Sequence, residues 1–173
     1  MSYAIRNDRQ GFRAVNGQDD VGHDEFFSAT VPMPTPDQIK VDIWQKIKVE
    51  RDRRKAGGVK VQVGGVDKWF HTDDASKTQH LANKDTAQDQ LAVGGQMSDF
   101  LLDPETGAKI PWKTMDGTFT PMTCQLAFDI VKAAKSGELA TFAAAETHRV
   151  AMEASADPAS YDYSGGWPKI YGE

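Results

Sequence analysis

The most constraining feature of the chain is an unbroken series of start and stop signals that predicts a helix, a hairpin and a second helix in succession. Thr35 is a good helix cap and Pro36 suits the first helical position. Apolar side chains then recur at helical spacing over residues 39–47. The glycine pair Gly57-Gly58 follows, and it is expected to end this first helix.

The residues after this glycine pair predict a β-hairpin. Valines alternate with polar residues over 59–63, which is the period of a half-buried strand. Gly64-Gly65 suits a two-residue turn, because both central residues of such a turn need positive φ. A return strand is therefore expected, and Thr72 or Asp73 then caps a surface helix that runs to about Leu91.

The second half of the chain carries weaker signals. Residues 94–108 are expected to form an irregular loop, and Asp116-Gly117 is the strongest hairpin signal in the sequence. Thr120 or Thr123 then caps a helix, with a break predicted at Ser136-Gly137 before an alanine-rich helix. Together with the elements above, the sequence thus predicts three to four helices and two short hairpins over residues 37–173.

The N-terminal region has a different character. Residues 3–7 and 11–16 are strand-like and predict a small hairpin, after which the proline-rich segment within 17–36 is expected to be an extended linker. We therefore predict an α+β fold in two parts. Residues 1–36 form a hairpin arm and linker, and residues 37–173 form a compact α+β domain.

Composition excludes several classes of protein. The net charge is −5 and no basic stripe is present, so a dedicated nucleic-acid binder is not expected. No apolar run approaches the roughly 20 residues that cross a bilayer, and the N-terminus lacks a secretory signal. Cys124 is the only cysteine, so it cannot form an intramolecular disulfide and is expected to be a small core residue.

No motif supports catalysis. The four histidines are scattered without the spacing of a zinc site, and Asp73-Asp74 is better explained by a helix N-terminus than by a metal. Nucleophile elbows and phosphate loops are missing from the sequence. We therefore predict no catalytic, cofactor-binding or metal-binding residues, and a protein that is not an enzyme.

Aromatic and large apolar residues are instead the candidates for binding a partner. Trp69, Trp112 and Phe119 lie on the hairpins and are expected to be core. The candidates lie in the N-terminal arm, before the linker, in the 94–108 loop and in the glycine-rich C-terminal tail. They are Tyr3, Ile5, Phe12, Phe26, Phe27, Phe100, Leu101, Trp167 and Tyr171.

Several short segments, which follow one another in the same order as in the family, resemble a domain of unknown function that recurs in tail proteins of tailed bacteriophages. The likeness covers most of residues 43–173, whereas residues 83–109 look longer and more polar than the usual passage. The start of the chain, Tyr3-Ala-Ile-Arg-Asn with Gly11-Phe-Arg-Ala-Val, is similar to that of phage tail and tail-fibre-assembly proteins. The matching pieces are Ile47-Lys48, Glu50-Arg51-Asp52-Arg53-Arg54, Gly57-Gly58-Val59, Trp69-Phe70-His71-Thr72-Asp73, Trp112-Lys113-Thr114, Asp116-Gly117 and the helix from Glu146 to Arg149.

The resemblance implies a location rather than a reaction. It implies a structural component of the tail tip, baseplate or tail-fibre complex that acts in virion assembly and host attachment. Such a protein is made in the host cytoplasm and resides in the virion tail. Its partners would be other tail proteins, with a host cell-surface receptor and a homotrimer as further expectations. The alternative is a tail-fibre assembly chaperone that is absent from the mature virion.

Overall fold

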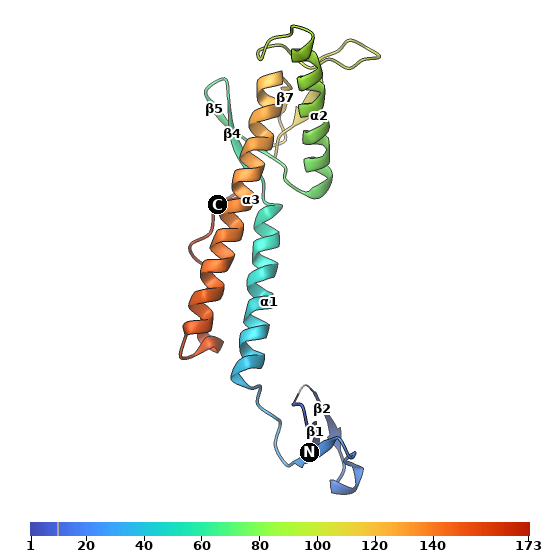
Figure 1. Ribbon diagram of the computed structural model, residues 1–173, viewed down its shortest axis with the longest axis vertical. Helices are drawn as coiled ribbons and strands as arrows, with labels where there is room; N and C mark the ends of the chain where they lie inside the picture. The colour runs from blue at the N-terminus through green and yellow to red at the C-terminus, as the bar shows by residue number, and fades with distance from the viewer. Residues whose placement is uncertain (10) are drawn as a thin grey trace. The chain divides into compact units, whose positions relative to one another are not determined.

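The computed structural model describes residues 1–9 and 11–173 (Figure 1). The chain divides into two compact units, Met1–Val41 and Asp42–Glu173. The division falls inside helix α1 (Pro36–Lys55), so the same helix belongs in part to each unit. The two units are described separately below.

The N-terminal unit is built on a three-stranded antiparallel sheet with strand order β2-β1-β3. Its strands are β1 (Ser2–Arg6), β2 (Phe12–Val15) and β3 (Glu25–Ser28), with a short 3-10 helix, η1 (Gln18–Asp20), before β3. The predicted hairpin is present as β1 and β2. Strand β3 was not expected, because the residues just before the proline-rich linker carried no strand pattern in the sequence.

Helix α1 begins at a reciprocal pair of caps. The Thr35 amide donates to Gln38 Oε1 at 2.7 Å, and the Gln38 amide donates to Thr35 Oγ1 at 3.2 Å. This capping box satisfies two of the amides that a helix start leaves without partners. At the other end, the helix stops at Lys55, just before the glycine pair as predicted, and Gly58 has φ +89°, a conformation that residues with a Cβ rarely adopt.

Both predicted hairpins are present in the C-terminal unit. Strands β4 (Val59–Val63) and β5 (Val66–Phe70) are joined by Gly64 and Gly65, whose φ values are +58° and +82°. Strands β6 (Pro111–Lys113) and β7 (Phe119–Pro121) form the second, shorter hairpin. Local turn chemistry was therefore sufficient to predict both.

The predicted break at Ser136-Gly137 is wrong, because α3 is one continuous helix of 31 residues, Cys124–Ala154. Thr123 caps it by accepting from the Leu126 amide at 3.1 Å. A Cβ placed on Gly137 would lie 3.2 Å from Val59 Cγ1, so this glycine lets β4 approach the helix closely. An isolated helical glycine costs only about 1 kcal/mol, and that cost does not end a helix held by packing on both sides.

The core of the C-terminal unit lies where α3 meets α2 (Asp74–Ala92) and β4 (Figure 1). Cys124 is buried in it as predicted, and α2 contributes the buried His80 and Ala87, so this helix is not purely a surface element. Trp69 and Trp112 are half-buried. The prediction that Phe119 is a core residue is wrong, since its side chain is 68% exposed. The same buried cluster also contains Val61, Phe70, Leu101, Met122, Leu126, Ala127 and Ile130.

After α3 the chain forms a second short 3-10 helix, η2 (Pro158–Ser160), and an irregular tail that returns along the unit to α1. Together these elements make the α+β fold that the sequence predicted. In the described part of the chain, no helix is both long enough and apolar enough to span a membrane.

Candidate functional site

The register of the N-terminal sheet brings four of the predicted contact residues onto one face. Ile5 in the central strand β1 lies directly opposite Phe12 of β2 and Phe26 of β3. Tyr3 shares that face, because residues two apart in a strand point to the same side. We call Tyr3, Ile5, Phe12 and Phe26 the aromatic face.

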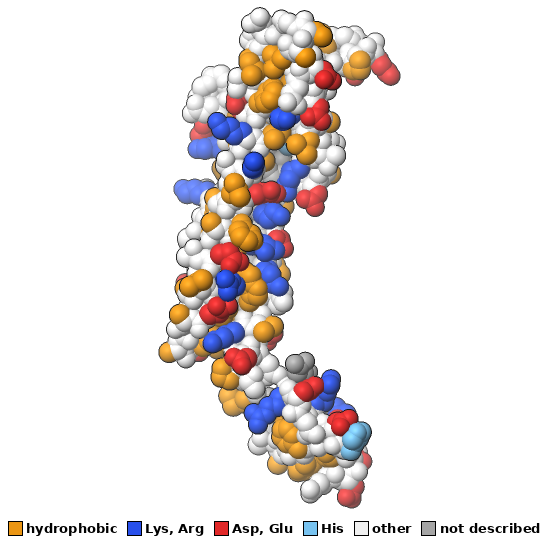
Figure 2. All heavy atoms as spheres, in the orientation of Figure 1, with side chains coloured by type: hydrophobic (Ala, Val, Ile, Leu, Met, Phe, Trp, Pro, Cys, Tyr) orange, Lys and Arg blue, Asp and Glu red, His pale blue; other side chains and the backbone are white. Residues whose placement is uncertain are grey.

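Most of this face is open to solvent. Phe12 is 53% exposed and Phe26 is 40% exposed, while Tyr3 is half-buried. The rings of Tyr3 and Phe12 meet edge to face with their centroids 5.6 Å apart. Ile5 is buried beneath its neighbours, so it supports the aromatic face rather than presenting a surface of its own. Figure 2 shows hydrophobic side chains gathered on part of this unit.

The opposite face of the sheet is covered by the chain itself. Ala4 and Val15 are buried there, and Phe27 lies beside them at the margin. Arg13 crosses this face, donating to Glu25 at 2.7 Å and to the Asp20 carbonyl at 2.6 Å. The hydrogen bond from Arg13 lowers the pKa of the Glu25 carboxyl, and a second bond from the Gly22 amide acts in the same direction. The loop before β3 therefore closes one side of the sheet and leaves the aromatic side open.

The size of the unit makes that open side significant. Chains of about 40 residues usually need a disulfide, a metal or a partner to remain folded, and this unit has no cysteine. Strands β2 and β3 are also edge strands, each with one side not paired to a described strand. The N-terminal unit therefore offers both an apolar face and strand edges to another surface.

The predicted contact residues of the 94–108 loop have two different roles. Leu101 is fully buried in the core, and its backbone bonds to Met122 and Ile110, so its role is structural rather than one of contact. Phe100 is half-buried, with the Lys109 amine 3.6 Å from its ring centroid. At the tip, Asp103 Oδ1 accepts from the Thr106 amide at 2.8 Å and holds a compact turn. The loop is thus anchored in the middle and polar at its end.

The aromatic residues of the C-terminal tail contact their own chain. Trp167 donates from Nε1 to the Tyr163 carbonyl at 2.7 Å and stacks on His148 with the ring centroids 5.0 Å apart. Tyr171 meets Trp69 edge to face at 6.1 Å and remains 40% exposed. Trp167 is therefore a packing residue in this structure, and only Tyr171 keeps a large exposed part.

A network around Arg54 holds this tail, and sequence reasoning missed most of it. Arg54 donates to Glu50, to the Pro168 carbonyl and to the Glu173 carboxylate, at 2.6, 2.8 and 3.0 Å. Hydrogen bonds from Arg53 and then Arg54 lower the pKa of Glu50 to about 2. Glu50 and Arg54 are four residues apart, which is the spacing of a pair on one face of a helix. Their link to the tail joins residues that are more than a hundred positions apart in the sequence.

His148 is a second anchor of the tail. Its Nδ1 lies 2.9 Å from the Tyr161 hydroxyl, and its Nε2 lies 2.8 Å from the Gly165 carbonyl. Elsewhere, His80 is buried, and burial lowers its pKa, so it is held neutral. Over residues 1–9 and 11–173, no group of three or more His, Cys, Asp or Glu side chains is placed to hold a metal ion.

The match with known proteins concerns the C-terminal scaffold. Residues 38–165 match the model of a family described as a domain of unknown function, DUF4376. The chain belongs to this family. No curated protein and no solved structure matches the chain.

The extent of the family match separates the parts of the molecule. The match begins within α1 and ends in the tail before Trp167, so it includes α2, both hairpins of the C-terminal unit and α3. The aromatic face lies outside it. The family domain is therefore the helical and hairpin scaffold, and the N-terminal sheet is an addition to it.

Proposed function

We propose that this chain is a non-enzymatic structural component of a bacteriophage tail, in the tail tip, baseplate or tail-fibre complex. Two observations support the proposal. The short segments between residues 47 and 149 resemble, in the same order, a domain found in phage tail proteins, and they fall within the family domain. The aromatic face lies outside that domain and has the character of an attachment surface.

The exposed aromatic face carries the proposal. A buried aromatic side chain removes roughly 150–250 Å² from water. Three such side chains can form the centre of an interface, but a stable interface covers about 800 Å² on each partner, so further contacts are needed. The free edges of β2 and β3 can extend the contact by pairing with a strand of the partner. A neighbouring tail protein is the partner that this arrangement fits, and a homotrimer is the oligomer suggested by analogy with tail appendages.

Mass spectrometry of purified phage particles tests the location. We expect the chain to be present in mature particles in a fixed ratio to the other tail proteins. If it is found only in lysates that contain assembling tails, the structural role is wrong and the tail-fibre assembly chaperone takes its place.

A double substitution tests the attachment surface itself. Phe12→Ser with Phe26→Ser removes the two most exposed rings of the aromatic face, and we expect the chain to be lost from particles while its C-terminal unit stays folded. Phe119→Ser is the matched control, because it changes an exposed phenylalanine in the C-terminal unit. Equal retention of the double variant and the control in particles would show that the aromatic face does not attach the chain.

Contact with a host receptor is the second part of the proposal, and the 94–108 loop is the region that suits it. Met97 and Leu102 are 44% and 49% exposed there, beside the polar turn at Asp103. Changing both to serine is expected to lower adsorption to host cells while particles still assemble. Normal adsorption of correctly assembled particles would remove the loop from the proposal.

A further inference from the structure

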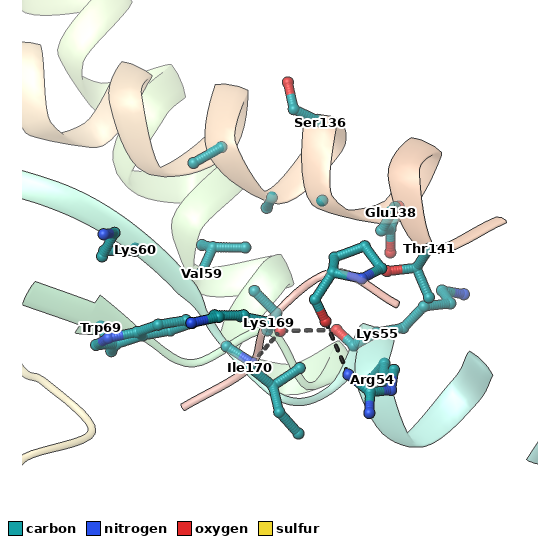
Figure 3. A pocket seen from close by; sticks show the side chains of 16 residues that line it. Arg54, Lys55, Val59, Lys60, Trp69, Ser136, Glu138, Thr141, Lys169 and Ile170 are labelled. Carbon is teal, nitrogen blue, oxygen red and sulfur yellow. Dashed lines mark hydrogen bonds between the residues drawn. The ribbon is translucent and has the colours of Figure 1, made fainter. Parts of the chain in front are cut away.

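A pocket of about 390 Å³ opens in the C-terminal unit where four elements meet (Figure 3). The end of α1, the β4–β5 hairpin, the middle of α3 and the tail all contribute to its lining. Its volume falls within the range of about 300–1,000 Å³ that is typical of small-molecule sites. None of the residues proposed above for attachment or receptor contact lines it.

The walls of the pocket are largely apolar. Val59 and Trp69 of the hairpin and Ile170 of the tail lie on one side in Figure 3, and α3 lies on the other. Gly137 on α3 adds no side chain, and Val59 packs close to the position where its Cβ would be. Apolar walls make more favourable contact with an apolar group than with water, so a ligand here would need an apolar body.

The polar groups at the pocket are mostly cationic. Four cations and one carboxylate line it, although the whole chain carries a net charge of −5. Lys60 pairs with Asp67, and Arg54 is engaged with the tail. Among the described residues, the amines of Lys55 and Lys169 have no hydrogen-bond or ion-pair partner. Two lysines thus remain available to an anion.

The hydroxyl of Thr141 adds an independent observation. Thr141 lines the pocket and is only 3% exposed, yet its hydroxyl has no hydrogen-bond partner among the described residues. Other helical threonines, such as Thr86 and Thr147, donate to the carbonyl four residues earlier, at 3.1 and 3.0 Å. The Thr141 hydroxyl therefore remains free to form a hydrogen bond with a polar atom in the pocket.

From these observations we infer that the pocket binds a small carboxylate that has an apolar body. The carboxylate would lie between the amines of Lys55 and Lys169, with the Thr141 hydroxyl donating to an oxygen of the ligand. The apolar part would lie against Trp69, Val59 and Ile170. This site is independent of the proposed attachment to a tail, so either one can fail without the other.

Titration followed by two-dimensional amide NMR tests the site with the full chain. The probes are hexanoate, hexanol and hexylamine, which share an apolar body and differ in the head group. Hexanoate is expected to shift the amide signals of Gly58, Gly137 and Thr141 saturably and to bind about tenfold more tightly than hexanol, the gain from one charge-assisted contact. Tighter or equal binding of hexylamine would overturn the inference, as would equal binding of inorganic phosphate, which has no apolar body.

Matched substitutions locate the interaction. Thr141→Val keeps the shape of a buried side chain and removes its hydroxyl, so hexanoate affinity should fall about tenfold, while Thr147→Val should leave it unchanged. Lys55→Gln with Lys169→Gln should weaken hexanoate at least as much and should leave hexanol unaffected. Lys132→Gln with Lys135→Gln has the same effect on net charge at exposed positions of α3 that do not line the pocket. An equal loss of affinity in this control pair would reduce the effect to net charge and would overturn the site.

Discussion

The two ends of the chain contain similar kinds of residue, but their aromatic side chains differ in exposure to solvent. The N-terminal sheet leaves Phe12 and Phe26 in solvent, whereas the C-terminal tail packs Trp167 against Arg54 and His148 of its own unit. Both segments are aromatic and interspersed with glycine and polar residues. The difference shows that an aromatic segment stays exposed where the rest of the chain provides no surface to cover it.

The tail finds its cover because the C-terminal unit supplies matched polar groups at the right places. Arg54 and the Gly57 carbonyl bond to the tail backbone, and His148 bonds to Tyr161 and Gly165. The N-terminal unit has about 40 residues, too few to build a second layer over its aromatic face. Size therefore explains the contrast better than composition does.

The largest expected effect on stability is the difference between a buried and an exposed phenylalanine. Phe70 is fully buried in the C-terminal core, so Phe70→Ala should lower the free energy of unfolding by about 3–5 kcal/mol. Phe12→Ala, in the open aromatic face, should cost far less, since the ring is 53% exposed. Chemical denaturation of both variants provides the comparison, and similar losses would mean that the aromatic face is packed in solution.

The docking of the tail can be broken by one methyl group. A Cβ at Gly57 would lie 2.5 Å from Ile170 Cγ2, so Gly57→Ala should displace Ile170 and cost about 1–3 kcal/mol. Amide hydrogen exchange measures this directly, because the Tyr171 amide donates to the Gly57 carbonyl at 2.9 Å and should lose protection. Gly17→Ala is the control, as its Cβ would meet no atom within 4 Å. Unchanged Tyr171 protection in Gly57→Ala would contradict the docked tail.

The acid sensitivity of the tail region follows from Glu50. Its pKa is lowered to about 2 by hydrogen bonds from Arg53 and Arg54, against an ordinary value of 4.5. A lowered pKa contributes stability that is complete above 4.5 and is lost as the pH falls towards 2. Glu50→Gln should therefore flatten the dependence of stability on pH in that interval, as measured by denaturation at several pH values. Glu105→Gln is the control, because it removes an exposed carboxylate that forms no ion pair among the described residues.

The smallest effect on stability is expected at the aromatic face, where the effect on assembly is largest. Phe26→Ser alters a side chain that is 40% exposed, so it should cost clearly less stability than Phe70→Ala in the fully buried core. The expected result is a nearly unchanged denaturation curve together with reduced incorporation into particles. A large loss of stability with normal incorporation would reverse the contrast between the two ends.

Several elements of the fold could be predicted because their determinants are close together in sequence. The start of α1 depends on Thr35 and Gln38, and the β4–β5 turn depends on Gly64 and Gly65. Each of these signals lies within four residues of the structure that it specifies. The same holds for the aspartate that caps α2, Asp73, which accepts from the Ser76 amide at 2.9 Å.

The features that the sequence did not predict depend on residues that are far apart in the chain. Continuity of α3 through Gly137 depends on β4 packing against it, and the pairing of β3 depends on the distant strand β1. Among the candidate contact residues, only the structure showed that four share one face of the sheet, that Leu101 and Ile5 are buried and that Trp167 is docked. The pocket beside Thr141 had no sequence signal, because four separate elements form it.

By itself, the sequence determined the α+β class, both hairpins of the C-terminal unit and most helix ends, because caps and turns act between near neighbours in the chain. The tertiary structure alone decided which aromatic residues are covered. Coverage depends on whether distant segments supply a matching surface, and the C-terminal unit supplies one to its tail whereas the small N-terminal sheet leaves its aromatic face exposed.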